Sequence, residues 1–561
     1  MAGSRFPEYR GEDLLLESRS SSWPGQIEKS SPGTGSVHVL GNARDPDHAS
    51  NRFRDSSAPD SLWRCSTRQN LTGASLPQIR KSLARAWRLV LAQQLNAALG
   101  AIDLIERQLD DVAPSIATRL LAATQTVRAV GLAFQDDSLA ALENALWIVR
   151  ESGASPDDHV ISTLCRLGYW QLGRLEAFHA LPRQQPRARW PRSHALSAMV
   201  DLSIEAAVAL DHLQISTAKR LASDALAIAA ATQAPPGLAA IPACLAAQLL
   251  YEEGHLDEAG AIVRDRLPAI NAEGSIECAL RAYRLLARVA RLRGQYDHAA
   301  IVLHEAEILG ERHGWPRLVA ACALERISLL LDTGRTKEAR LSVEQLDRYA
   351  DAHHTGFGHS RTEIMRYATL ARCRVSWAEA PSREVAAAFR RLYHRAVDRR
   401  NLYAGCRLAV ELAGMLASIG EAEEADALFF QAIKSGAGAG LHQIFLEQGE
   451  ESGLLLHRAY DRAEAPGSAD RDALPLIGSL LCRWNASQAA RRPEARISGV
   501  LTEREREILG RISQGMPNKQ IARVLHISPE TVKSHIKRIF LKLAVSTRAE
   551  AVSQAKSLGL V

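Results

Sequence analysis

The chain has 561 residues, of which 46% are hydrophobic, 24% are charged and 5% are aromatic, and its formal net charge is +6. This balance is that of an ordinary globular protein, and the length allows several domains. The eight cysteines form no close pairs in the sequence, which argues against a disulfide framework or a zinc site and indicates a reducing cytoplasm. The chain opens with no basic-then-apolar signal, and no uninterrupted apolar stretch is long enough to cross a bilayer. We therefore expect a cytoplasmic protein without membrane contact.

The first segment, residues 1–77, is rich in Ser, Gly, Pro, Asp and Arg and has no sustained hydrophobic periodicity. Such a composition cannot bury enough apolar surface to offset the entropy of ordering. We predict that this segment is disordered.

Residues 78–460 are predicted to be helical and repetitive. The clearest units share a glycine followed five residues later by an alanine, at Gly254 and Ala259, Gly294 and Ala299, Gly334 and Ala339, and Gly420 and Ala425. Weaker copies follow Gly173 and run from Gln214 to Ala218. The first three glycines are forty residues apart. Glycine permits a tight turn and alanine a close helix contact, so the period indicates stacked helical hairpins like those of tetratricopeptide repeats. The predicted fold class is all-α, a helical-repeat solenoid.

The stretch from Leu285 to Ala339, which includes His313-Gly-Trp-Pro-Arg-Leu318, resembles the helical repeats of MalT-like regulators. Those regulators carry an ATP-binding domain, whose phosphate loop needs a Gly-Lys pair. This sequence contains no Gly-Lys pair, and its one Gly-rich candidate, 32–36, lacks the lysine. The resemblance therefore implies a regulator with repeats but without the ATPase, and we expect no cofactor.

Other catalytic patterns are also missing from the sequence. There is no Gly-x-Ser-x-Gly elbow, and His304-Glu305 lacks the second histidine of a zinc helix. His353, His354 and His359 could suggest a metal, but they have no carboxylates in register and are interpreted as a polar loop. We predict neither an enzyme nor a metal site.

Residues 461–496 contain Ala-Pro-Gly-Ser and Arg491-Arg-Pro-Glu, which are typical of a linker. One short helix is expected around Leu476 to Trp484. The segment that follows would then be tethered rather than rigidly fused.

Residues 497–561 predict four short helices joined by turns. Thr502 with Glu505 forms a capping box at the start of the first helix, and Gly515 can end that helix. Ser528 is the N-cap of the third helix, with Pro529 in its first turn. The third helix has one apolar stripe, made of Val532, Ile536, Ile539, Phe540 and Leu543.

The last helix begins at Thr547, which forms a capping box with Glu550. This helix is expected to bury Val552, Ala555 and Leu558. Short helices linked this tightly are typical of a helix-turn-helix. Residues 496–561 also hold twelve Lys and Arg against five Glu and no Asp, a net charge of +7 compared with +6 for the whole chain. The positive charge is therefore local, as a phosphate-binding surface requires.

The segments Leu501-Thr-Glu-Arg-Glu-Arg-Glu-Ile-Leu, Gly515-Met-Pro-Asn-Lys-Gln-Ile-Ala and Thr531-Val-Lys-Ser-His-Ile-Lys-Arg closely resemble the LuxR-type (FixJ/NarL-like) helix-turn-helix, with the motif at about 518–537. The resemblance implies that the third helix lies in the major groove. It assigns Lys533, Ser534 and Lys537 to base edges. It assigns phosphates to Thr531, His535, Arg538, Asn518 and Lys519.

Some of these assignments have alternatives or depart from the family. His535 could instead be tucked against the first helix of the domain. The family commonly has Ser and Glu where this chain has Pro517 and Gln520, so the second helix has a weaker cap here. Ala544 replaces the usual Gly after the third helix, which makes that turn less favourable. The fourth helix often supplies the family's dimer contact, which implies Ala551, Gln554 and Ala555 here.

Together these features predict a transcriptional regulator, which the resemblance suggests is an activator. It would bind double-stranded DNA as a homodimer on paired half-sites and contact RNA polymerase. The repeats would receive a small-molecule inducer or, with a slight preference, a protein partner. The alternative is a repeat scaffold whose terminal module docks on a protein instead of DNA. The basic outer face of the third helix argues against that alternative.

Overall fold

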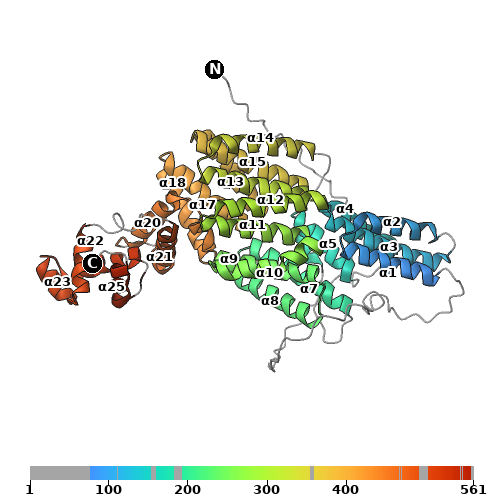
Figure 1. Cartoon of the computed structure of the whole chain (residues 1–561), viewed down its shortest axis with the longest axis horizontal. Coiled ribbons are helices and arrows are strands. Elements are labelled where there is room, and N and C mark those ends of the chain that lie inside the picture. The colour runs from blue at the N-terminus through green and yellow to red at the C-terminus, as the bar shows by residue number, and fades with distance from the viewer. Residues whose placement is uncertain are drawn as a thin grey trace, which may run out of the picture. The chain divides into compact units, whose positions relative to one another are not determined.

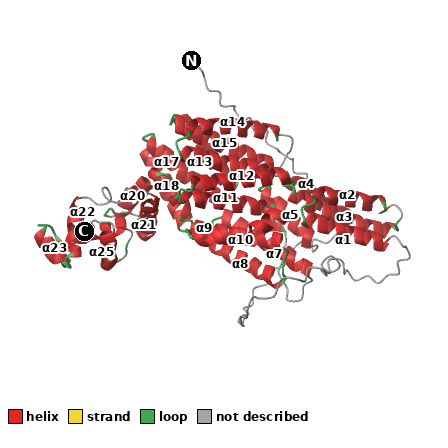
Figure 2. Cartoon of the chain, in the orientation of Figure 1, coloured by secondary structure: helices red, strands yellow, loops and turns green. Residues whose placement is uncertain are grey.

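The computed structural model describes residues 76–109, 112–152, 159–181, 192–353, 359–466, 468, 470–491, 503–543, 545 and 547–557. Every element in these ranges is a helix, most of them paired side by side with the next helix in the chain (Figure 2). This agrees with the predicted all-α class. Residues 1–75, most of the segment expected to be disordered, lie outside the described ranges.

The first described helix, α1, begins two residues before the boundary expected for the repeat region (Figure 1). Its first helices are α1 (Leu76–Leu91), α2 (Leu95–Arg107), α3 (Pro114–Phe134), α4 (Ser138–Ser152), α5 (His159–Gln171) and α6 (Leu175–Ala180). The middle helices are α7 (Arg192–Asp211), α8 (Ile215–Ala231), α9 (Pro236–Glu253), α10 (Leu256–Glu273), α11 (Ile276–Leu292), α12 (Tyr296–His313), α13 (Pro316–Asp332), α14 (Thr336–Ala352), α15 (His359–Glu379) and α16 (Arg383–Asp398).

The region ends with α17 (Leu402–Ser418), α18 (Ala422–Ala432), a π-helical turn (Ile433–Ala437), α19 (Gln443–Leu446), α20 (Glu450–Glu464), a 3-10 turn (Arg471–Ala473) and α21 (Leu474–Arg491). Each hairpin packs on the next, since α9 contacts α11, α11 contacts α13, and α13 contacts α15. One continuous apolar core runs through these helices from Met199 to Leu481. The arrangement is that of a helical-repeat solenoid.

The predicted glycine corners are present. At Gly254, with φ of +92°, the next N–H, that of His255, donates to the Leu250 carbonyl at 2.9 Å. The Gly254 N–H donates to the Tyr251 carbonyl, so the helix ends in a Schellman motif. The partner Ala259 is fully buried at the start of the second helix. The same positive φ and the same hydrogen bonds recur at Gly173, Gly294, Gly334 and Gly420.

Other corners use the same geometry without glycine. Leu213, Gln93 and Asp136 have φ of +60°, +59° and +66° and occupy the glycine position between the two helices of their hairpins. Arg400, with φ of +56°, does so between α16 and α17. Of these four corners the sequence pattern marks only the one at Leu213, through the weaker copy from Gln214 to Ala218, because a side chain at the glycine position is tolerated at a cost of about 1 kcal/mol.

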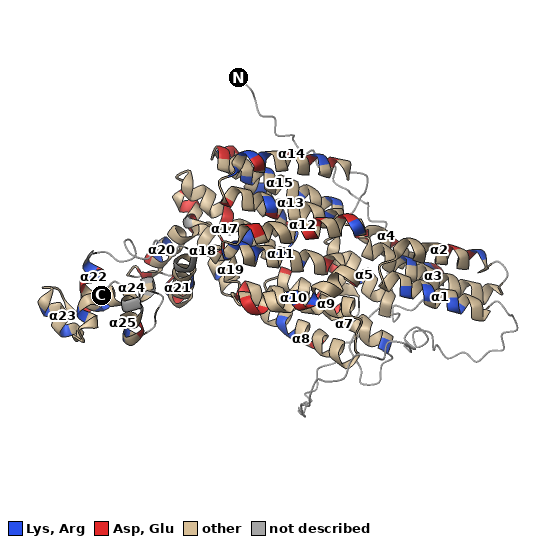
Figure 3. Ribbon diagram, in the orientation of Figure 1, with Lys and Arg blue, Asp and Glu red and all other residues tan. Residues whose placement is uncertain are grey.

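Buried ion pairs join neighbouring hairpins. Nε and Nη2 of Arg166 on α5 lie 2.5 Å from carboxylate oxygens of Asp201 and Glu205 on α7, and all three side chains are almost fully buried. Nη2 of Arg288 on α11 lies 2.6 Å from the buried Glu325 on α13. Burial opposes ionisation of Glu325, but the charges of Arg288 and Arg284 outweigh it and hold its pKa well below the ordinary value. Positive and negative residues are correspondingly interspersed over the repeat helices (Figure 3).

A second buried group of polar side chains, here called the closing cluster, consists of Tyr251, Glu252, Tyr403, Arg407 and Glu447. Tyr251 donates to Glu447 at 2.7 Å, and Tyr403 donates to Glu252 at 2.5 Å. Arg407 lies between the two carboxylates and pairs with both. The cluster joins α9, α17 and the end of α19, which are far apart in the sequence.

The interval expected to be a linker is 461–496, and most of its residues are described by the structure. It holds the end of α20 and the whole of α21, a longer helix than the one expected around Leu476. The reason is an apolar face: Ile477, Leu480 and Leu481 are buried in the same core as the repeats. The helices α20 and α21 therefore share an apolar core with the repeat helices.

One described helix, α7, is long and apolar enough to cross a membrane by length and composition. Of its most apolar window, 61% is buried inside the protein. It also carries the buried Asp201 and Glu205 that pair with Arg166. These features fit a core helix of the repeats.

Candidate nucleic-acid interface

The last four helices are α22 (Glu503–Ser513), α23 (Asn518–Val524), α24 (Pro529–Leu543) and α25 (Arg548–Ser557). They enclose an apolar core of their own, separate from the core of the repeats. Its buried members are Ile508, Leu509, Ile512, Ile521, Ala522, Leu525, Val532, Ile539, Leu543, Ala551 and Ala555. The predicted apolar stripe of α24 faces this core, with Ile536 and Phe540 partly buried at its edge.

Local hydrogen bonds begin and end these helices where the sequence predicts. Gly515 has φ of +80° after α22. The Ser528 hydroxyl accepts from the Thr531 N–H at 3.0 Å and so caps α24. Thr547 and Glu550 form a reciprocal capping box on α25, with bonds of 3.3 Å and 3.2 Å. Pro517 supplies no side-chain bond to α23, as expected for a weaker cap.

Three further sequence expectations lie outside the described residues. Thr502, the first member of the box expected on α22, is one of them, and Ala544, after α24, is another. Leu558, expected to be buried by the last helix, also falls outside.

The side of α24 opposite the core is basic and exposed. Lys533, Ser534, Lys537 and Arg538 all lie on it. The Lys533 ammonium is 2.8 Å from Glu530 one turn earlier, but both side chains are mostly exposed, so the pair is weak. The helix therefore presents hydrogen-bond donors outward while Val532 and Ile539 fix its rotation from within.

Thr531 and His535 are less available than their neighbours. The Thr531 hydroxyl is 2.8 Å from that of Ser528, so it takes part in the helix cap. His535 is half-buried, and its Nδ1 is buried without a hydrogen-bond partner among the described residues. This geometry favours the tucked alternative for His535 over a phosphate contact.

At the start of α23, Lys519 is exposed and Asn518 is half-buried. The Asn518 side-chain oxygen accepts a hydrogen bond from Arg548 Nη1 at 3.2 Å. Arg548 Nη2 also donates to the Met516 carbonyl. Arg548 thus ties α25 to the turn before α23, a positioning role that the sequence analysis missed because its partners lie some thirty residues away.

Arg504 is a second residue that was missed. Its Nη2 donates to the Leu525 carbonyl at 2.6 Å, at the end of α23. The turn that follows contains His526, whose φ is +52°. Arg548 thus holds the turn before α23 and Arg504 the turn after it, although neither lies on the outer face of α24.

The expected dimer contact needs correction in part. Ala551 and Ala555 are fully buried in the core of the domain, because they form the face of α25 that packs on α22 and α24. They are not available on the surface of this domain. The side chain of Gln554 lies outside the described residues.

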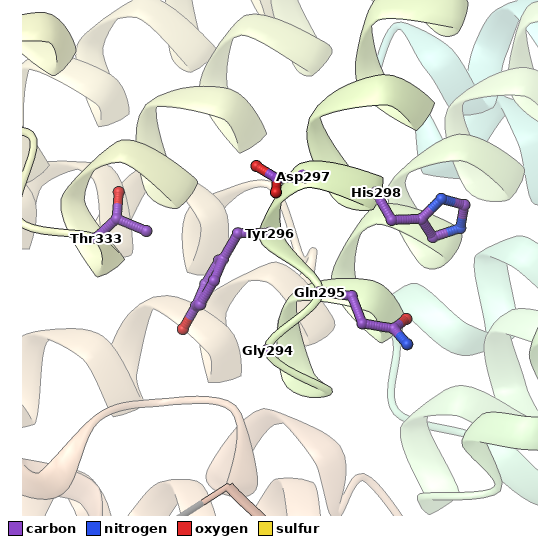
Figure 4. A pocket seen from close by; sticks show the side chains of 6 residues that line it. All are labelled: Gly294, Gln295, Tyr296, Asp297, His298 and Thr333. Atoms are coloured by element: carbon purple, nitrogen blue, oxygen red, sulfur yellow. The ribbon is translucent and has the colours of Figure 1, made fainter.

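A hollow elsewhere, at the corner between α11 and α12, offers no comparable site. It has a volume of about 720 Å³ and is lined by Gly294, Gln295, Tyr296, Asp297, His298 and Thr333. Figure 4 shows these side chains pointing in different directions rather than toward one point. A small-molecule site normally has a few converging polar groups in an apolar pocket. His359, considered above with His353 for a metal, instead has Nε2 3.0 Å from the buried Arg317.

Comparison with known proteins finds a family that matches the terminal domain. Residues 499–555 match the family described as bacterial regulatory proteins, luxR family. A relative in Mycobacterium tuberculosis (strain CDC 1551 / Oshkosh), the probable transcriptional regulatory protein NarL, is 34% identical over 134 residues, which are 24% of this chain and 56% of the relative. The CsgBAC operon transcriptional regulatory protein of Escherichia coli (strain K12) is 50% identical over 58 residues, 10% of this chain and 27% of the relative.

The repeats also have a relative. The HTH-type transcriptional regulator MalT of Vibrio cholerae is 26% identical over 334 residues, which cover 56% of this chain and 35% of MalT. The chain thus spans about half or less of the length of these relatives. Among solved structures, a Rap protein complexed with competence and sporulation factor aligns with 65% of this chain at 14% identity and a TM-score of 0.47.

Proposed function

Residues 499–555 form a helix-turn-helix domain of the luxR family, and on this premise we propose that the chain is a DNA-binding transcriptional regulator. The observation that carries the proposal is the orientation of α24. Its apolar stripe is buried against α22, α23 and α25, and its opposite side presents Lys533, Ser534, Lys537 and Arg538 to solvent. A helix with one such face can enter the major groove and donate to base edges and phosphates.

The proposed contacts with DNA fall into two groups, those to base edges and those to phosphates. Lys533, Ser534 and Lys537 lie toward the middle of α24 and would reach base edges, since Lys suits the guanine acceptors. Arg538 and Lys519 are exposed beside them and would hold phosphates. Asn518 and Thr531 would assist mainly through the turn and the cap that they stabilise.

The assembly on DNA is proposed to be a homodimer on paired half-sites, as is usual for helix-turn-helix proteins. Because Ala551 and Ala555 are buried, its contact would come from exposed positions of α25 such as Ala549 and Ser553. RNA polymerase contact and activation are part of the proposal on the basis of family resemblance. The protein would act in the cytoplasm.

The repeats, which are similar to part of MalT, would receive the signal, as a small molecule or a protein partner. We propose that they extend through α21 to Arg491, beyond the boundary at 460 that the composition suggests, because α20 and α21 share their core. The DNA-binding domain would keep its bounds of 497–561.

Genome-wide DNA capture with the intact protein tests this function. The wild type should enrich a shared, partly palindromic site, and Lys533→Ala/Lys537→Ala should lose it. A matched control, Lys81→Ala/Lys337→Ala, removes the same charge from exposed positions of α1 and α14 and should behave as wild type. If wild type and the α24 variant give the same diffuse, salt-sensitive background, α24 does not read sequence and docking on a protein becomes the better explanation.

A further inference from the structure

The end of the repeat region lies against the DNA-binding domain. Helix α24 contacts α21, and a cleft of about 360 Å³ lies where they meet. Tyr460, Leu474, Pro475, Gly478 and Cys482 line it from α20 and α21, which we call the platform. Lys537, Phe540 and Val545 line it from α24 and the residues just after it. The walls of the cleft are thus largely apolar.

Lys537 links this contact to the proposed DNA-reading face. Its ammonium lies 3.9 Å from Glu464 Oε1 at the end of α20 and 5.9 Å from the centre of the Tyr460 ring. The acidic and aromatic groups of the platform are therefore placed to attract a lysine. The side chains of Lys537 and Glu464 remain 63% and 42% exposed, so the ion pair alone is weak and readily broken.

The platform itself is firmly part of the repeats. Ile477, Leu480 and Leu481 of α21 are buried in the repeat core. Arg483 Nη1 donates to the Glu253 carbonyl at the end of α9 at 2.8 Å. The helices α20 and α21 also pack so closely that a side chain at Gly453 would overlap the Trp484 ring. A change in the arrangement of α9, α17 or α19 would consequently move the platform.

DNA and the platform cannot both hold α24. The major groove is about 12 Å wide and a helix with its side chains is about 10–12 Å across, so a groove that contains α24 has no room for α21 beside it. Eleven residues, 492–502, connect α21 to α22. A chain of that length reaches at most about 40 Å when extended, which is sufficient for the domain to leave the platform without leaving the protein.

We propose that the platform is an intramolecular docking surface for α24, and that DNA and the platform compete for the Lys537 side of this helix. The competition rests on the DNA-binding function proposed above, whereas the docking does not. In this arrangement the repeats lower DNA affinity while α24 is docked. A ligand of the repeats would raise DNA affinity only if it favours the undocked state.

The docked state can be measured by cross-linking. A short reagent that joins a thiol to an amine should connect Cys482 and Lys537 within one chain, and peptide mass spectrometry would identify the product. Cys482→Ser should abolish it. A random-sequence DNA duplex at low salt should suppress the product. Failure to form the product in the wild type, or a yield that the duplex leaves unchanged, would overturn the proposal.

A second experiment measures the affinity of the protein for the same DNA duplex. Glu464→Gln/Leu474→Gln removes the acid and one apolar side chain from the platform and should raise affinity by about fivefold or more. The matched control is Glu305→Gln/Leu341→Gln, which makes the same changes at exposed positions of α12 and α14, away from the platform. Equal affinities for the platform variant and the control contradict the competition. If no protein binds the duplex, the DNA-binding function and the competition both fail, while the cross-link still decides whether α24 docks.

Discussion

The repeats and the terminal domain use positive charge in different ways. The chain has ten lysines, and five of them lie between residues 519 and 556. The repeats rely instead on arginine, and Arg166, Arg288 and Arg407 form ion pairs in their interior. A guanidinium suits a buried bidentate pair, whereas an ammonium is a strongly hydrated point charge on a flexible stem. Positive charge is therefore mainly structural in the repeats and available to a ligand in the terminal domain.

If arginine has a structural role in the repeats, the largest loss of stability is expected when the buried Arg166 is replaced. Arg166→Met leaves the buried Asp201 and Glu205 carboxylates without the guanidinium that neutralises them, and should lower the free energy of unfolding of the repeats by about 3–5 kcal/mol. Urea unfolding followed by circular dichroism measures this. Arg335→Met, which removes an exposed arginine that pairs with Glu338, is the control and should leave the midpoint nearly unchanged. Equal midpoints for the two variants would mean that the buried charges are not structural.

Acid should also destabilise the repeats more than the terminal domain. Burial raises the pKa of Glu447, but Arg407 and Arg288 outweigh it and lower that pKa to about 2 from 4.5. Because the folded-state pKa is below the unfolded one, the stabilisation is present above pH 4.5 and is lost as the pH falls toward 2. Burial conversely raises the pKa of Glu252, which shares Arg407 with Glu447.

Glu447→Gln should therefore be less stable at pH 7 and should lose less stability between pH 5 and pH 2 than the wild type. Thermal unfolding across that window gives both values. Glu338→Gln, an exposed carboxylate, serves as the control and should follow the wild-type profile. Identical pH profiles for Glu447→Gln and the wild type would show that this carboxylate does not govern acid stability.

Substitutions at the corners between helices should change stability by smaller amounts, and in opposite directions. Gly294→Ala introduces a methyl group that meets nothing within 4 Å, so its cost of about 1 kcal/mol is backbone strain at φ of +72°. Arg400→Gly removes comparable strain at φ of +56° and should stabilise the repeats by up to about 1 kcal/mol. Shifts of the melting temperature in opposite directions are expected. A shift in the same direction would mean that the side chains, and not the backbone, determine these corners.

The corners also show how far the sequence alone leads. Glycine followed by alanine marks Gly254, Gly294, Gly334 and Gly420 correctly, because positive φ strongly favours glycine there. Leu213 and Arg400 adopt the same conformation without glycine, and only the weaker copy from Gln214 to Ala218 points to the first of these two corners. Packing of the flanking helices outweighs the local strain at those two corners.

The ion pairs escaped prediction for a different reason. Arg284 pairs with Glu325 and Arg374 with Glu411, at separations of 41 and 37 residues, close to the period of the repeats. A search for opposite charges offset by one repeat would have located them. In the terminal domain the caps and the apolar stripe could be predicted because their partners are local. The contact between Lys537 and Glu464 could not, since no local pattern links residues so distant in sequence.

The smallest predicted effect concerns one exposed lysine of the terminal domain. If Lys519 neutralises a phosphate, Lys519→Ala should weaken binding about equally for all sequences and make the slope of log affinity against log salt shallower by about 0.9. Lys337→Ala removes an exposed lysine from the repeats and should leave the slope unchanged. Lys533→Ala should instead alter the preferred sequence, because Lys533 is proposed to reach a base. Equal slopes for Lys519→Ala and the wild type would show that this exposed charge does not contact DNA.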